Sequence, residues 1–147
     1  MFAATPPIKV SRVRRRLAAW VPVVVWAGVI FALSAVPGQE LPSVSVPHSD
    51  KLAHTLVYGV LGALAFRAVR LTSPPERSRA VIAAAAVAIA TLYGITDELH
   101  QTLTPQRSPD WHDVAADMFG GALGAAVMSA VPWMKRLACS MMGRSDE

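Results

Sequence analysis

Four long apolar stretches alternate with polar segments along the chain. The first, residues 17–36, has 20 residues without a charge, and a helix of that length crosses a hydrocarbon core of about 30 Å. The others are residues 52–69, 80–96 and 114–134, whereas residues 37–47 are too rich in proline and serine to hold a helix. The pattern predicts an all-α fold, an integral membrane bundle of four transmembrane helices.

Small residues recur at four-residue spacing in the last two apolar stretches. Ala86, Ala90 and Gly94 form one stripe, and Gly120 with Gly124 forms a GxxxG pair. Such residues let the backbones of neighbouring membrane helices approach closely. We therefore expect tight helix contacts along both stripes.

Composition supports a membrane protein. Hydrophobic residues make up 53% of the chain and charged residues 16%, against about 25% charged in ordinary soluble domains. A cleaved signal peptide is the alternative for the first stretch, because residues 32–35 loosely resemble a cleavage site. The apolar run of this first stretch is longer than the roughly 7–15 residues that form the apolar core of a signal peptide. This favours an uncleaved helix. The single Cys139 excludes an intramolecular disulfide.

Basic residues are unevenly distributed between the polar segments. Residues 1–16 hold five, residues 67–79 hold four and residues 135–147 hold three, whereas the other side of the membrane would carry only Lys51 and Arg107. The positive-inside rule then places both termini in the cytoplasm. This divides the chain into a basic cytoplasmic arm (residues 1–16), a four-helix membrane domain (17–134) and a cytoplasmic tail (135–147). The arm is a topology signal, so the expected partner is the lipid bilayer and not nucleic acid.

Polar residues gather at the predicted extracytoplasmic ends of the second, third and fourth helices. Ser108 followed by Pro109 is a good N-cap and N1 pair, so the last helix is predicted to begin there. Asp110, Asp113 and Asp117 then share one helix face. The candidate catalytic residues of this cluster are His54, Asp97, Glu98 and Asp113, and the candidate ligand-binding residues are Asp50, Lys51, Tyr58, Gln101, Arg107 and Asp117.

The depth of some of these residues favours a functional site over a structural polar network, which is the alternative. His54, Tyr58 and Asp117 each lie a turn or more inside an apolar stretch, and polar groups at such depth face the bundle interior and pair. Arg107 is predicted to fold back over the acids, as a strong cation in the loop that carries several of them.

Several chemistries are compatible with the cluster. Histidine with carboxylates can transfer protons, and Lys51 with Arg107 can hold a phosphate. Histidines and carboxylates can also bind Zn²⁺ or Mg²⁺. No HExxH, CxxC or DxDxDG spacing occurs in the sequence, so neither a metal site nor another cofactor is predicted.

The polar motifs, taken together, resemble those of the VanZ-like family of small bacterial membrane proteins. The matching pieces are FALS at residues 31–34, DKxxHxxxYxxxG at 50–62, YGxxDExHQ at 93–101, PxR at 105–107 and DVAADxxG at 113–120. The chain departs from the resemblance at Asp117, where asparagine is expected in the D-x-x-x-N element.

The resemblance implies a multi-pass protein of the bacterial cytoplasmic membrane, in a family named for resistance to teicoplanin, a glycopeptide. It implies a cell-envelope setting and no reaction. Two functions stay open. The first is binding of an envelope lipid or glycopeptide at the polar cluster; the second is an enzyme that acts on a lipid-linked phosphate or peptidoglycan precursor by carboxylate and histidine acid–base chemistry. An intramembrane metallopeptidase ranks below both, because the residue spacings expected for it are not met.

Overall fold

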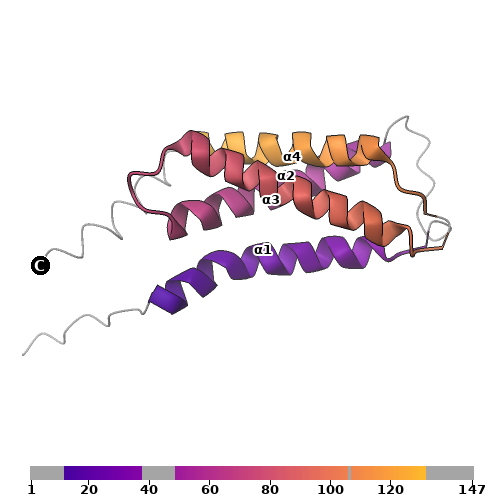
Figure 1. Ribbon diagram of the computed structural model, residues 1–147, viewed down its shortest axis with the longest axis horizontal. Helices are drawn as coiled ribbons and strands as arrows, with labels where there is room; N and C mark the ends of the chain where they lie inside the picture. The colour runs from indigo at the N-terminus through magenta and orange to yellow at the C-terminus, as the bar shows by residue number, and fades with distance from the viewer. Residues whose placement is uncertain (1–11, 38–48, 106, 132–147) are drawn as a thin grey trace, which may run out of the picture.

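The computed structural model describes residues 12–37, 49–105 and 107–131, and this part of the chain contains four helices and no strand. The helices are α1 (Arg12–Ser34), α2 (Ser49–Thr72), α3 (Arg79–Gln101) and α4 (Trp111–Ala130). Successive helices run in opposite directions (Figure 1). The end of α1, the start of α2 and the loop from α3 to α4 therefore lie together at one end of the bundle. The predicted all-α, four-helix architecture is confirmed.

Three of the helices are long and apolar enough to cross a membrane: α1, α3 and the Asp50–Thr72 part of α2. On α1, large apolar side chains such as Val24, Val25 and Phe31 are more than half exposed, as suits a surface that faces lipid and not water. The predicted fourth span, α4, is not among the three.

All four helices begin before their apolar stretches, and α2 and α3 also end after them. Ser78 caps α3, where its side chain accepts the backbone N–H of Val81. The prediction that the last helix begins at Ser108 and Pro109 is wrong, since α4 begins at Trp111 with Asp110 as its N-cap. The start is displaced because the backbone N–H of Asp110 donates to the carboxylate of Glu98 on α3, at 2.7 Å.

Glycines of α2 and α4 face each other and bring the two backbones into contact. A Cβ built on Gly62 would lie 2.6 Å from the Cα of Gly121, and one built on Gly124 would lie 2.8 Å from the carbonyl carbon of Gly59. No real side chain fits at such distances, so α2 and α4 depend on these glycines to pack as closely as they do.

The alanine stripe of α3 is buried as predicted. Ala86 and Ala90 have no exposed surface, and a Cβ built on Gly121 would meet the side chain of Ala90 at 2.7 Å. Gly94, at the end of the stripe, packs against Asp117 of α4. The small residues thus set the distance between α3 and α4 at the level of the polar cluster.

Candidate functional site

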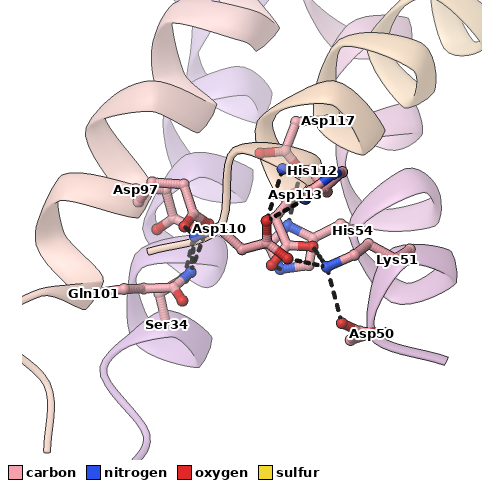
Figure 2. Close-up of polar contacts among 11 residues, drawn as sticks. Ser34, Asp50, Lys51, His54, Asp97, Gln101, Asp110, His112, Asp113 and Asp117 are labelled. Atoms are coloured by element: carbon pink, nitrogen blue, oxygen red, sulfur yellow. Dashed lines mark hydrogen bonds and ion pairs between the residues drawn. The ribbon is translucent and has the colours of Figure 1, made fainter. Parts of the chain in front are cut away.

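The predicted site residues lie at one end of the bundle, where the C-terminal ends of α1 and α3 meet the N-terminal ends of α2 and α4 (Figure 2). Consecutive helices are antiparallel, so the C-terminal end of one helix and the N-terminal end of the next lie at the same end of the bundle. The side chains form two neighbouring groups, one around Lys51 and His54 and one around Asp97 and Glu98.

Lys51 is the cation of the first group. Its Nζ lies 2.6 Å from Asp113, 2.7 Å from Asp110 and 3.1 Å from Asp50. The side chain of Asp50 is the most exposed of the three acids and that of Asp113 is the least. The Lys51 ammonium and the hydrogen bonds from His112 hold the pKa of Asp110 well below its ordinary value.

His54 joins α2 to α4 one turn deeper. Its Nδ1 lies 2.9 Å from Oδ1 of Asp117, and its Nε2 lies 4.0 Å from Oδ2 of Asp113. Asp117 has no exposed surface, and its second oxygen has no hydrogen-bond partner among the described residues. A Cβ on Gly94 would lie 2.5 Å from that oxygen, so the carboxylate fits there because residue 94 is a glycine.

Asp97, Glu98 and Gln101 form the second group at the end of α3. The Gln101 amide donates to both carboxylates at 3.3 Å. Asp97 also accepts the hydroxyl of Ser34 on α1 at 2.8 Å. All three α3 side chains are nearly fully buried, and the two carboxylates accept hydrogen bonds from three different segments of the chain, at Ser34, Gln101 and Asp110.

A cavity of about 220 Å³ lies beside the cluster, between α1 and α2. Leu33, Ala53 and Val57 supply apolar wall, and the polar lining comes from Ser34, Asp50, His54, Tyr58, Gln101 and Arg107. Tyr58 is only 1% exposed, and its hydroxyl lies beside Asp97 without a hydrogen bond of standard geometry to any described residue. A buried hydroxyl without a partner is costly, and this one belongs to a side chain that lines the cavity.

Arg107 does not lie over the acids, and that prediction is wrong. Its Nε donates to the backbone carbonyl of Val36 at 3.4 Å, and no ion pair joins it to a carboxylate of the described residues. Lys51 takes the expected place because it extends from the first turn of α2 directly toward the start of α4. Arg107 lines the cavity instead.

Two residues of the cluster were not among the predicted site residues. Ser34 binds Asp97, and Asp110 binds both Lys51 and Glu98. Ser34 ends the FALS motif, and Asp110 shares a face with Asp113 and Asp117, so both carried a signal in the sequence. Of the other described histidines, His100 stacks on Phe31 with the ring centroids 4.2 Å apart, and the exposed His112 contacts Asp110 at 2.7 Å.

The arrangement defines a class of protein: a helical membrane protein with a buried cluster of acids, a histidine and a lysine at one end of its bundle. The chain belongs to the VanZ/LLP1 family, whose model matches residues 5–132. The resemblance inferred from the polar motifs is thereby confirmed. No curated protein and no solved structure matches the chain significantly.

Proposed function

We propose that this protein lies in the bacterial cytoplasmic membrane with four spans and both termini in the cytoplasm, and that it binds the phosphorylated head of an envelope lipid at its extracytoplasmic end. The glycopeptide resistance implied by the resemblance would follow from altered access to such a lipid-linked precursor. The observation that carries the proposal is the cavity with the unpartnered Tyr58 hydroxyl in its wall.

The size of the cavity favours a lipid head over a whole glycopeptide. Pockets for drug-sized ligands measure roughly 300–1,000 Å³, and this one measures about 220 Å³. It can hold a phosphate or one sugar. The apolar wall at Leu33, which is 53% exposed on the outer face of α1, provides a surface along which an isoprenoid chain can leave toward the bilayer.

Arg107 is the cation best suited to the phosphate. Lys51 already contacts three carboxylates, so it cannot bind an anion without leaving them. The hydrogen bond of Arg107 uses Nε, and no described residue accepts from its two terminal nitrogens. A guanidinium binds phosphate through such paired N–H groups.

An enzyme is the second candidate, and one specific contact favours it. His54 lines the cavity, and the buried Asp117 holds its Nδ1 at 2.9 Å. A carboxylate that orients a histidine in this way is a common arrangement for a general base or acid. In this case the bound lipid diphosphate would be hydrolysed by water to a monophosphate and inorganic phosphate.

Tyr58→Phe tests the binding proposal. Without ligand, removing an unsatisfied buried hydroxyl should raise the stability of the purified protein in detergent by about 1 kcal/mol. The thermal shift produced by a polyprenyl phosphate should fall in this variant and in Arg107→Gln. Polyprenol, which lacks the phosphate, should produce little shift in any of them, and Arg70→Gln at the other end of α2 is the matched arginine control.

Loss of stability in Tyr58→Phe with an unchanged response to polyprenyl phosphate would contradict the proposal. His54→Gln then separates binding from catalysis. If the protein is an enzyme, the wild type releases inorganic phosphate from a polyprenyl diphosphate and His54→Gln does not, although it still binds the lipid. If neither releases phosphate, the second candidate is rejected.

A further inference from the structure

Three side chains from three different helices converge with metal-ligand chemistry. His54 of α2, Glu98 of α3 and Asp113 of α4 each place one possible ligand atom within 4.8 Å of the other two. We propose that these residues form a binding site for a single divalent transition-metal cation, Zn²⁺ or Mn²⁺. This proposal does not depend on the lipid proposed above.

The three ligand atoms are somewhat farther apart than the ligands of a bound ion. Zn²⁺ binds histidine nitrogen at about 2.0–2.1 Å and carboxylate oxygen at about 2.0–2.2 Å, so two ligands of a tetrahedral ion lie about 3.4 Å apart. His54 Nε2 and Asp113 Oδ2 are 4.0 Å apart, and all three ligand atoms lie within 4.8 Å of one another. Binding of an ion therefore requires the side chains to close by about 1 Å, which rotation about their χ angles can supply.

Each ligand is held by a partner on the side away from the proposed ion. An ionised carboxylate only accepts hydrogen bonds, so the contact with Asp117 requires the proton of His54 to be on Nδ1. The lone pair of Nε2 is then directed toward Asp113 and Glu98. A buried carboxylate behind a histidine is the usual outer-shell arrangement at metal sites, where it fixes the tautomer and raises ligand basicity.

The two carboxylates are oriented in the same way. Asp113 uses Oδ1 for Lys51 at 2.6 Å, which leaves Oδ2 facing His54. The backbone N–H of Asp110 holds one oxygen of Glu98 at 2.7 Å, and Gln101 holds the other at 3.3 Å. A carboxylate oxygen has more than one lone-pair site, so Glu98 keeps capacity for an ion.

The cavity adjoins the proposed site through His54. Of the three ligands only His54 lines it, next to Tyr58, whose ring is parallel to the imidazole with the centroids 6.2 Å apart. An open position of the ion on the side of His54 would therefore face the cavity, where a water or ligand oxygen has room. Three protein ligands and one open position are typical of catalytic and substrate-binding zinc sites.

The donor set restricts the choice of metal. Ca²⁺ and Mg²⁺ prefer oxygen ligands alone, whereas imidazole with carboxylates suits Zn²⁺ and Mn²⁺. The absence of a local metal motif in the sequence does not oppose the site, because each ligand comes from a different helix and no two share a short spacing.

The test is Zn²⁺ titration by calorimetry of the full chain purified in detergent and freed of metal with a chelator. The wild type should bind one Zn²⁺ per chain. His54→Gln, Glu98→Gln and Asp113→Asn should each weaken binding at least tenfold. His112→Gln is the matched histidine control, and Glu76→Gln, in the exposed turn between α2 and α3, is the matched acid control for Glu98→Gln; both should bind as the wild type does.

Asp117→Asn distinguishes the outer shell from the ligands, because it should weaken Zn²⁺ by about 10–100-fold without abolishing binding. Substituted Co²⁺ on the wild type gives a second measurement that does not depend on the variants being folded. Absorption bands of four- or five-coordinate Co²⁺ that Zn²⁺ displaces support the site. Absence of stoichiometric binding, a six-coordinate aqueous Co²⁺ spectrum, or equal weakening in the His112 and Glu76 variants would overturn it.

Discussion

At the scale of the residue, the cluster depends on which cation neutralises its acids. The sequence predicted Arg107 for this role, whereas in the structure Lys51 reaches the carboxylates, with three contacts of 3.1 Å or less. Its side chain is 26% exposed and that of Asp113 is 13% exposed, so solvent screens these contacts only in part. Arg107 makes one long hydrogen bond to a backbone carbonyl and lines the cavity instead.

The first prediction follows from this division. Lys51→Met leaves Asp110 and Asp113 close together without a cation, and we expect it to lower the free energy of unfolding by about 2 kcal/mol, within the range for charged hydrogen bonds. Arg107→Gln should lower it by less than about 1 kcal/mol. Thermal unfolding in detergent, followed by circular dichroism, measures both.

A double variant supplies the control for this prediction. Asp113→Asn in the Lys51→Met background removes the uncompensated charge and should recover part of the lost stability, because the two effects are coupled through one contact. An arginine variant as destabilised as the lysine variant would show that the neutralising cation has been assigned wrongly.

At the scale of the element, the position of each helix depends on small residues. Gly59, Gly62, Gly121 and Gly124 allow α2 and α4 to touch along their backbones. This contact sets how far His54 lies from Asp113 and Asp117. Gly28 of α1 is different, since a Cβ there would meet nothing within 4 Å.

The second prediction compares these glycines. Gly62→Ala should destabilise the protein by about 1–3 kcal/mol, the usual cost of overpacking, because the added methyl meets the backbone of Gly121. Gly28→Ala should be neutral or stabilising by up to about 1 kcal/mol, since alanine is the better helix former. Unfolding temperatures of the two variants, measured side by side, decide the matter, and equal effects would mean that the close approach of α2 and α4 is not required.

At the scale of the whole molecule, charge is separated along the bundle. Arginines of α1's first turns, the end of α2 and the start of α3 lie at one end, and the acidic cluster lies at the other (Figure 1). Under the proposed topology the arginines face the cytoplasm, in accord with the positive-inside rule, and the cavity faces the outside of the cell.

The third prediction tests this orientation with cysteines. In a Cys139→Ser background, Leu103→Cys, at a position 81% exposed in the α3–α4 loop, should react in intact cells with a thiol reagent that cannot cross the membrane. Glu76→Cys, in the exposed turn between α2 and α3, should react only after the membrane is opened. The reverse pattern would place the cluster and its cavity on the cytoplasmic side.

The sequence by itself determined the number of helices, the membrane setting, the family and most of the residues in the cluster. These are local properties, because the length of an apolar stretch can be compared directly with the bilayer thickness. The buried stripes of small residues could also be predicted from the sequence, because membrane helices need small residues wherever their backbones approach closely.

Only the tertiary structure decided which polar groups pair. The N-cap of α4 is Asp110 and not the predicted Ser108, because the carboxylate of Glu98 on α3 accepts the backbone N–H of Asp110. Lys51, not Arg107, contacts the acids, and His54, Glu98 and Asp113 place possible ligand atoms within 4.8 Å of one another. Such pairings depend on the rotation and depth of each helix relative to its neighbours. Glycine contacts between helices far apart in sequence set that rotation and depth, so no local pattern could show them.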